Sequence, residues 1–262
     1  MKEYRLTFQK NIRDLGGLIG FNNRRIKDGR LYRGGALIKV KEEDVPTIKS
    51  FKLTDIVDFR TNIEHKYRPD YQIEGVSYHN FSTFKENPKE EAEVRKYDDG
   101  NLLWFIEEGD DGFKHLKKTY DSFVTTKEGR EAFKNFFKVL LSKDDIVVYF
   151  HCSQGKDRAG FAAYLLEIAL GVSHEDAFKD YLLTNVAMEE KIKHLLPMVE
   201  NKEYYDEEYR KSLIDVFSAK EEYLNSAISK ANEHYGSIMN FLTKELEVDI
   251  DKLRELYLET IN

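Results

Sequence analysis

Apolar and polar positions divide the chain into short strands that alternate with helices. Residues 54–59 form a compact β-branched run, and residues 76–81 predict a second strand. Residues 145–150 are almost continuously apolar, which is typical of a strand that is covered on both faces of a sheet. Residues 42–52 predict a short helix with Pro46 near its first turn.

Turn and capping residues mark the ends of further elements. The Asp28-Gly29 pair between apolar flanks predicts a hairpin over residues 25–32. Residues 159–170 predict a helix that is closed by Gly171. Apolar spacing and capping signatures predict further helices at residues 127–141, 173–185, 187–200, 206–217, 219–235, 237–246 and 249–260.

Strands that alternate with helices, followed by a run of helices, indicate an α/β fold with helical additions. Residues 1–262 contain no convincing linker, so we expect one domain. Residues 84–142 are expected to be a mostly helical insertion before the apolar strand, with breaks near residues 98–101 and 109–112. Residues 186–262 are expected to be a helical tail packed on the same domain.

Composition narrows the class of function. The net charge of -7 argues against nucleic-acid binding, because that requires a basic face. No apolar run is long enough to cross a membrane, and the first residues lack the apolar core of a signal peptide. We therefore expect a cytoplasmic protein, or one exported without a visible signal. The single cysteine excludes an internal disulfide, and nothing in the pattern indicates an oligomeric state.

The candidate chemistry is concentrated in residues 151–160, which read His-Cys-Ser-Gln-Gly-Lys-Asp-Arg-Ala-Gly between the apolar strand and a helix. A tight loop that enters a helix turns its amides inward and forms an anion-binding nest. Arg158 is suited to clamp two phosphate oxygens, and the positive surroundings favour the nucleophilic thiolate of Cys152. The other phosphate-binding positions are expected to be His151, Ser153, Gln154, Gly155, Lys156, Ala159 and Gly160.

This loop predicts a cysteine-dependent phosphatase. A lone cysteine is more often a small buried hydrophobic residue, and Cys-x5-Arg spacing by itself is weak evidence. The combination with a buried strand, a preceding histidine, an internal glycine and a following helix makes the signal specific. Phosphoryl transfer needs mainly positioning and charge stabilisation, so we expect neither a metal nor another cofactor.

The loop resembles the His-Cys-x-x-Gly-Lys-Asp-Arg-Thr-Gly signature of a bacterial tyrosine and dual-specificity phosphatase family. Further matches to motifs of that family lie at residues 11–17, 31–34, 58–64, 180–185 and 234–237. The resemblance implies a tyrosine-phosphatase-like fold, with a short, mostly parallel sheet, helices on both faces and a helical C-terminal region. It also implies a phosphocysteine intermediate and action on phosphotyrosine, with phosphoserine, phosphothreonine and phosphoinositides as further candidate substrates.

The proton donor for the leaving group is open between two aspartates. Asp157 matches the loop aspartate of myotubularin-type lipid phosphatases, although it could instead form an ion pair that only orients Arg158. Asp58 is the alternative donor, because its strand is expected to end at the same edge of the sheet. An ion-pair network that braces the loop is expected from the supporting residues Arg13, Asp14, Asp58, Arg60 and Glu64.

Two loop positions bear on turnover and substrate. Ala159 stands where the family has Thr or Ser, and that hydroxyl supports the departing thiolate in similar enzymes, so we expect slow hydrolysis of the intermediate. Lys156 favours a head group with several phosphates, with simple support of phosphate binding or a solvent-facing position as alternatives. Residues 102–106 and 201–209 are expected either to pack on the core or to form a lid over the pocket.

Other classes fit the chain less well. A phosphoinositide phosphatase is the main alternative. A sulfurtransferase also uses a loop cysteine, but the loop from His151 to Arg158 and the N-terminal motif favour a phosphatase. An arsenate reductase would need resolving cysteines, and an inert phosphate-binding module would not need both Cys152 and Arg158.

Overall fold

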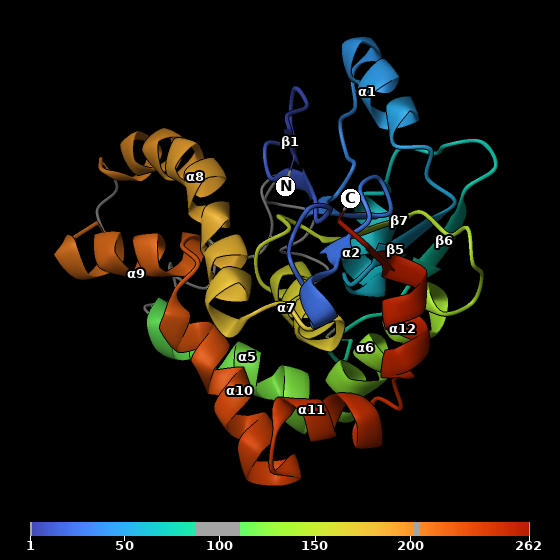
Figure 1. Cartoon of the computed structure of the whole chain (residues 1–262). Helices are drawn as coiled ribbons and strands as arrows, with labels where there is room; N and C mark the ends of the chain where they lie inside the picture. Colours follow the sequence, from blue (N-terminus) through green and yellow to red (C-terminus); the bar gives the residue numbers. More distant parts are fainter. Residues whose placement is uncertain (1, 87–110, 202–204, 262) are drawn as a thin grey trace.

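The computed structural model describes residues 2–86, 111–201 and 205–261 (Figure 1). Within these residues, six strands form one sheet in the order β1-β2-β4-β7-β5-β6. Strands β4, β7, β5 and β6 are parallel, whereas β1 and β2 are antiparallel. The strand bounds are β1 Lys2–Tyr4, β2 Ile12–Asp14, β4 Leu31–Gly35, β5 Asp55–Asp58, β6 Ser77–Asn80 and β7 Val148–Cys152. The predicted α/β fold with a mostly parallel sheet is confirmed.

Helices cover both faces of this sheet. Alternate residues of β5 and β7 point to opposite faces, so that Val57 and Val148 enter one apolar cluster and Ile56 enters the other. The larger cluster includes residues of α5 (Gly112–Thr125), α6 (Lys127–Leu140), α7 (Arg158–Leu170), α10 (Glu221–Tyr235) and α12 (Ile250–Tyr257). The smaller cluster lies under α1 (Val45–Ser50). The remaining helical elements are η1 Phe21–Asn23, η2 Glu42–Asp44, α2 Asn62–Tyr67, α8 His174–Val199, α9 Glu207–Phe217, α11 Ile238–Asn240 and the π-turn η3 Phe241–Glu245.

Helix α7 lies at the centre of the molecule (Figure 1). Every residue after Arg158 in this helix is buried, which explains its apolar composition on all sides. It packs against α8 and α12, and it ends at Gly171, which adopts a left-handed conformation with φ of 81°. The predicted helix and its glycine stop are therefore confirmed.

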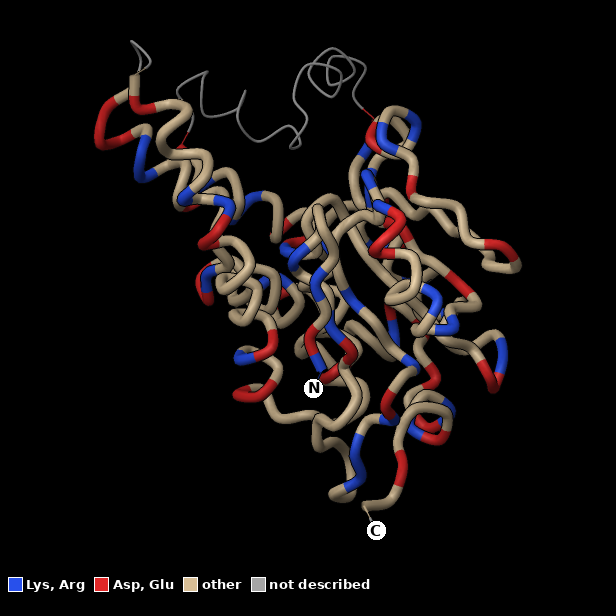
Figure 2. Tube along the Cα trace, turned by 90° about the horizontal axis from the view of Figure 1, so that it is seen from above, with Lys and Arg blue, Asp and Glu red and all other residues tan. Residues whose placement is uncertain are grey.

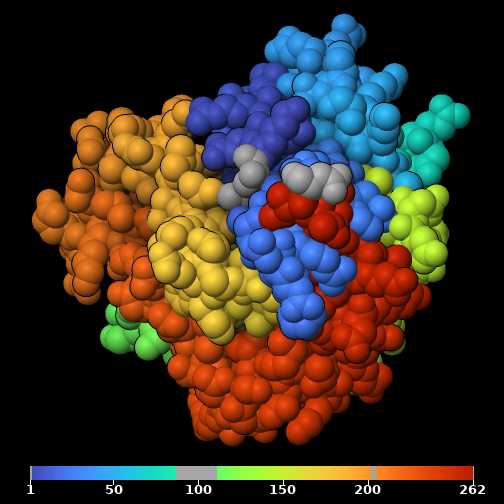
Figure 3. All heavy atoms as spheres, viewed as in Figure 1, coloured from blue at the N-terminus to red at the C-terminus, as the bar shows by residue number. Residues whose placement is uncertain are grey.

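Helices α8 and α9 form a lobe that extends to one side of the body (Figures 1 and 3). The two helices pack on each other around a separate apolar cluster. The members of this cluster are Leu195, Val199, Tyr209, Leu213, Val216 and Phe217. The N-terminal segment lies beside α8, where Arg5 forms an exposed ion pair with Glu190 at 2.9 Å.

Strand β7, which leads into the loop after Cys152, begins later than its apolar pattern predicts. The predicted strand covers residues 145–150, but β7 runs from Val148 to Cys152. The reason is its register, because Val148 pairs with Leu31 and Cys152 pairs with Gly35 of β4. The strand therefore delivers Cys152 directly to the edge of the sheet where the loop begins.

The predicted hairpin over residues 25–32 is wrong. A turn does form at Gly29, with φ of 72°, but β3 (Arg25–Ile26) pairs with β8 (Leu258–Glu259) instead of with β4. Strand β4 lies between β2 and β7, so both of its edges are already hydrogen-bonded and neither can accept β3. The same pairing ends α12 at Tyr257, earlier than the predicted residue 260.

The two predicted helices at residues 173–185 and 187–200 form one continuous helix, α8. No glycine interrupts this range, and its proline, Pro197, lies in the last turn. The side chain of Asn185 does not break the helix, because it exchanges hydrogen bonds with the backbone of Ala219. Of the predicted insertion, α5 and α6 are observed, and residues 87–110 lie outside the described residues.

Acidic and basic residues are interspersed along the Cα trace in Figure 2. In the part of the chain that the structure describes, none of the helices has the length and apolar character needed to span a membrane.

Candidate active site

A tight loop joins the end of β7 at Cys152 to the start of α7 at Arg158. Its third residue, Gly155, has φ of 69°, a conformation that glycine adopts without strain. A Cβ atom at this position would lie 2.3 Å from the carbonyl carbon of Gly34. The loop therefore lies directly against strand β4, and only glycine fits at the crossing.

Outward-facing carbonyl groups fix the orientation of the loop peptides. Asn11 Nδ2 donates to the Gln154 carbonyl at 2.9 Å, and Arg33 Nη2 donates to the Gly155 carbonyl at 3.0 Å. In a trans peptide the N–H group points opposite to the C=O group. The amides of Gly155 and Lys156 therefore face away from these partners, as an anion-binding nest requires.

Arg158 is held by a buried carboxylate from helix α2. Arg158 Nη1 lies 2.6 Å from Glu64 Oε2, and Nη2 lies 3.1 Å from Oε1 and 3.1 Å from Ser153 Oγ. Glu64 also accepts from the Thr61 amide, because the two residues form a capping box at the start of α2. Burial raises the pKa of Glu64, but the charge of Arg158 and these hydrogen bonds outweigh burial and lower it to about 2.

Cys152 is buried, with 3% of its surface exposed, and it lies near the N-terminal end of α7. The positive end of a helix stabilises a nearby anion. The pKa of Arg158 is raised above its ordinary value. Burial, the largest effect, lowers this pKa, but Glu64 and, to a smaller extent, the nearby Cys152 sulfur raise it. The start of α7 and the guanidinium of Arg158 thus place positive charge beside the sulfur.

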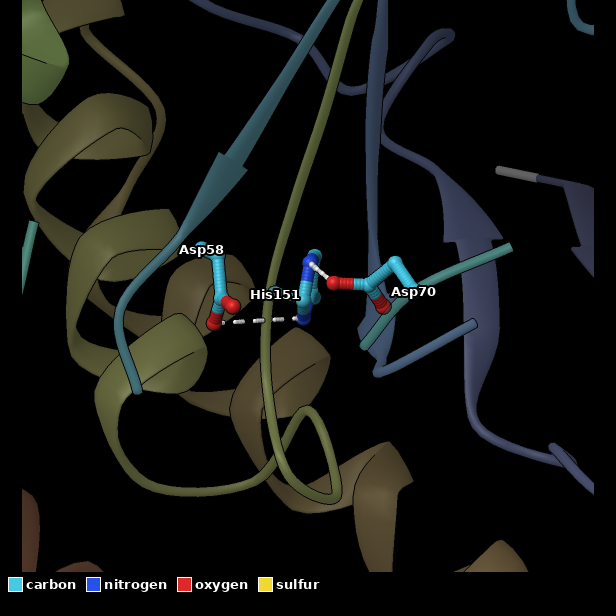
Figure 4. A group of neighbouring side chains, drawn as sticks. All are labelled: Asp58, Asp70 and His151. Atoms are coloured by element: carbon cyan, nitrogen blue, oxygen red, sulfur yellow. Dashed lines mark ion pairs between the residues drawn. The ribbon is translucent and has the colours of Figure 1, made fainter. Parts of the chain in front are cut away.

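His151, which precedes Cys152 in β7, lies between two carboxylates (Figure 4). Its Nε2 is 3.3 Å from Asp70 Oδ2, and its Nδ1 is 3.7 Å from Asp58 Oδ1. Burial lowers the pKa of His151, but Asp70 and Asp58 outweigh burial and raise it above its ordinary value. The Nδ1 atom of His151 also lies 3.2 Å from the Cys152 carbonyl oxygen, so the imidazole links the backbone at Cys152 to both carboxylates.

The same carboxylates also bind Arg60. Arg60 Nη2 lies 2.8 Å from Asp58 Oδ2 and 2.6 Å from Asp70 Oδ2. Burial raises the pKa of Asp58, but His151, His65 and Arg60 outweigh it and hold the pKa far below its ordinary value. Asp58 is thus an ion-pair partner that braces the loop, which argues against it as the proton donor. Although His151 and the two aspartates are close enough to share a metal ion, a cation there would have to displace the guanidinium.

A second group of buried ion pairs, formed by residues of β2, β4 and α8, also supports the loop. Arg13 Nε lies 2.6 Å from Asp180 Oδ1, and Arg33 binds Asp180 Oδ2 while it also holds the Gly155 carbonyl. The predicted network role of Arg13 is thus observed. Asp14 instead accepts from the amides of Gly16 and Gly29, so that it fixes a turn and has no part in the network.

Lys156 and Asp157 point away from β4 towards the helical region. Lys156 is buried, and its Nζ donates to the Val216 carbonyl at 2.6 Å and to the Ser218 carbonyl at 3.2 Å. The same Nζ lies 3.1 Å from Asp157 Oδ1. These contacts favour anchoring of the loop to the end of α9 and contradict a solvent-facing lysine. Asp157 has a partly exposed side chain, and its Oδ1 also accepts from Tyr120 at 3.1 Å.

Two other loop positions are packing positions. Ala159 is fully buried in the first turn of α7. A Cβ atom on Gly160 would lie 3.1 Å from Arg33 Nη2 and 3.2 Å from the ring of Tyr181. Gly160 therefore lets the arginine and the tyrosine approach the helix closely.

Several residues at this site were not predicted by sequence reasoning. Arg33 and Asp180 lie within matched motifs without an assigned role, and an arginine inside an apolar strand is the signal that marks Arg33. Asp70 and Tyr120 carry no local signal, because only the fold brings them to the loop.

A groove of about 500 Å³ lies beside the loop. Ser153 and Gln154 form part of its wall, and other walls carry both apolar and basic side chains, including Phe8, Lys10, Ile38, Arg68, Met188 and Lys191. Of the two segments expected either to pack on the core or to form a lid, residues 102–106 lie outside the described residues. In the other segment, Tyr209 packs in the cluster between α8 and α9, which favours a core role.

The sheet, the strand–loop–helix unit and the Cys-x5-Arg spacing together define the tyrosine phosphatase class. Comparison with known families agrees, because the model of the tyrosine phosphatase family matches residues 4–259. This chain therefore belongs to that family.

Two named proteins are similar to this chain. A protein of Cupriavidus necator that carries the provisional name of tyrosine-protein phosphatase is 28% identical over 257 residues, covering 95% of this chain and 85% of its own. The triple specificity protein phosphatase PtpB of Mycobacterium tuberculosis is 22% identical over 261 residues, covering 88% of this chain and 92% of its own.

Proposed function

We propose that this protein is a metal-independent phosphomonoesterase that acts through a phosphocysteine intermediate. The observation that carries this proposal is the loop between Cys152 and Arg158, with its amides facing inward and its arginine clamped by Glu64. Such an arrangement binds a tetrahedral dianion before reaction and stabilises the charge that develops during it.

The chemistry takes two steps. The Cys152 thiolate attacks phosphorus, the bond between phosphorus and the ester oxygen breaks, and Asp157 gives its proton to the departing oxygen. Water then attacks the phosphocysteine and loses a proton to the Asp157 carboxylate. Inorganic phosphate leaves and the thiolate is restored, so that atoms and protons balance over the cycle. Arg158 binds the non-bridging oxygens in both steps.

Phosphotyrosine is the preferred substrate class in this proposal, with phosphoserine, phosphothreonine and phosphoinositides as further substrates. The groove beside the loop has apolar walls for an aryl ring and basic side chains for neighbouring acidic groups. The name of the mycobacterial relative states triple specificity for that protein. The case for a lipid as main substrate depended on Lys156 as a second cation for the substrate. Its ammonium group instead binds backbone carbonyls at the end of α9, which weakens that case.

Turnover of p-nitrophenyl phosphate by reduced protein in the presence of a chelator tests the proposal. We expect hydrolysis that vanadate inhibits and that Cys152→Ser abolishes, while Cys152→Ser retains vanadate binding because the loop is intact. Transfer of sulfur from thiosulfate to cyanide, with no phosphate release, would instead identify a sulfurtransferase. Activity that survives in Cys152→Ser would refute the role of the cysteine.

Asp157→Asn and Asp58→Asn separate the two candidate acids. The readout is kcat/KM, because it reports the step in which the leaving group departs, whereas hydrolysis of the intermediate is common to both esters. On phenyl phosphate, whose leaving group is poor, loss of the true acid is expected to cost on the order of 10²–10⁴-fold in kcat/KM. On p-nitrophenyl phosphate, whose leaving group needs little protonation, the loss is expected to be much smaller. We expect this pattern for Asp157→Asn, and similar losses on both esters for Asp58→Asn, because Asp58 acts through Arg60 and His151.

A further inference from the structure

Two buried tyrosines connect Asp157 to the helical region. Tyr120 of α5 and Tyr181 of α8 are both fully buried, and their hydroxyl oxygens lie 2.8 Å apart. The Tyr120 hydroxyl also lies 3.1 Å from Asp157 Oδ1. The backbone amide of Lys220, which precedes α10, donates to the Tyr181 hydroxyl. Three helices therefore contribute to the position of one carboxylate.

The donors and acceptors of this chain have one consistent direction. Asp157 Oδ1 is an acceptor, so Tyr120 must donate to it. The Lys220 amide is a donor, so Tyr181 accepts from it and uses its own proton for the Tyr120 oxygen. Burial raises the pKa of Tyr120 well above its ordinary value, so its hydroxyl keeps the proton that this direction requires.

Asp157 does not have the usual side-chain role of a residue at the start of a helix. It occupies the N-cap position of α7, where aspartate commonly accepts from the backbone amides of the first turn, but its side chain makes no such bond. Both of its described partners, Tyr120 and Lys156, bind the same oxygen, Oδ1. Within the described residues, Oδ2 is left to carry the transferable proton. Because Oδ1 accepts hydrogen bonds whether or not Oδ2 is protonated, the same contacts hold the carboxyl group in both steps of the reaction.

We infer that Tyr120, supported by Tyr181, is a positioning residue that aims Asp157 Oδ2 at the leaving-group oxygen. This inference rests on the proposed function, in which Asp157 is the general acid. The Tyr120 proton has Asp157 Oδ1 as its acceptor, so the chain of buried hydroxyls ends on the carboxyl group and fixes the position of Oδ1. With Oδ1 fixed by Tyr120 and Lys156, the direction of Oδ2 is fixed as well.

Tyr120→Phe removes one hydroxyl and leaves the ring in place. On phenyl phosphate we expect kcat/KM to fall about tenfold or more, because misplacing a reacting group by ~1 Å costs on the order of 10²-fold. On p-nitrophenyl phosphate we expect a change below about twofold, because this leaving group needs little protonation. Tyr164→Phe is the matched control, since Tyr164 is also buried but its hydroxyl contacts His174 and not the loop.

A double variant separates positioning of the acid from general support of the fold. If Tyr120 acts only through Asp157, then Tyr120→Phe costs nothing further in an Asp157→Asn background. Equal losses on both esters for Tyr120→Phe, or an additive loss in the double variant, would overturn the inference. Should Tyr120→Phe fail to fold, Tyr181→Phe carries the same test with a smaller expected effect.

The Asp157 variant and the tyrosine variants distinguish failure of the acid assignment from failure of the positioning role. If Asp157→Asn itself shows no dependence on the leaving group, the acid assignment falls and the inference falls with it. If Asp157→Asn shows that dependence and neither tyrosine variant does, the acid assignment stands and the positioning role alone is wrong. Thermal unfolding and vanadate affinity, measured for each variant, check that the fold and the loop are intact.

Discussion

Replacing Glu64 by glutamine tests whether one buried carboxylate fixes the arginine of the loop. Glu64 Oε2 lies 2.6 Å from Arg158 Nη1, and Oε1 lies 3.1 Å from Nη2. Glutamine keeps the shape of the side chain but replaces one acceptor oxygen by an amide donor. That donor must face a donor on Arg158 and another on either Ser153 or Thr61. The variant therefore loses the charge and buries an unsatisfied polar group.

The pKa of Glu64 gives the size of the effect on stability. Burial raises this pKa, but Arg158 outweighs burial, so that the pKa is about 2 in place of the ordinary 4.5. This difference corresponds to about 3 kcal/mol in favour of the ionised carboxylate. Because the folded-state pKa is depressed, the stabilisation is fully present above pH 4.5 and is lost as pH falls towards 2. We expect wild type to be more stable than Glu64→Gln by about 3 kcal/mol at neutral pH, with a smaller difference below pH 4.5.

Urea unfolding at a series of pH values measures this difference, and kcat/KM for p-nitrophenyl phosphate measures its effect on catalysis. We expect kcat/KM to fall on the order of 10²-fold, because the guanidinium is no longer held in place. Glu259→Gln is the control, since Glu259 also pairs with an arginine, Arg25, but both side chains are exposed to about a third or more. Exposed pairs are worth less than about 1 kcal/mol. Similar stability and undiminished activity in both variants would refute the reasoning.

Three further substitutions test separate features of the loop. Gly155→Ala is expected to abolish activity and to destabilise the fold strongly, because its Cβ would meet the Gly34 backbone at 2.3 Å. Gly75→Ala is the control, since Gly75 also has a positive φ but lies in open space, and it is expected to cost about 1 kcal/mol in urea unfolding. Ala159→Thr is expected to speed hydrolysis of the phosphocysteine, so burst and steady-state kinetics that match wild type would contradict it. Lys156→Ala is expected to slow phosphotyrosine peptides and phosphoinositides equally, because its ammonium binds the end of α9, and a loss confined to the lipid would contradict this.

Local pattern was sufficient to predict the elements whose environment is simple. The helix after the loop is apolar on all sides because it is buried on all sides, and its glycine stop needs no tertiary partner. The loop between strand and helix, with its cysteine, glycine and arginine, is recognised from residues 151–160 alone, since strand, turn and helix follow one another within a few residues. Features that depend only on sequence neighbours were therefore predicted well.

Features that depend on distant partners were not. Whether Arg25 and Ile26 pair with residues 31–32 or with the C-terminal strand is decided by β2 and β7, which occupy both edges of β4. Tyr120 reaches Asp157 only because α5 lies beside α10 and the loop, and its spacing along α5 is that of an ordinary core residue. The sequence alone predicts that Lys156 is a cation for the substrate, and only the fold shows that the end of α9 lies next to it.

Three elements of the fold hold the loop from different directions. Helix α2 holds Arg158 through Glu64, strand β4 holds the Gly155 carbonyl through Arg33, and the end of α9 holds Lys156. Replacing a whole buried ion pair of this kind by packed apolar residues often changes stability little, because the cost of removing the charges from water offsets most of their attraction, although removing one partner alone costs about 3–5 kcal/mol. The effect of these charges on a dianion site is larger, since donors that are already oriented need no rearrangement when the substrate binds or when charge moves in the reaction. The buried arginines and carboxylates behind the loop are therefore better explained by preorganisation of the site than by stability of the sheet.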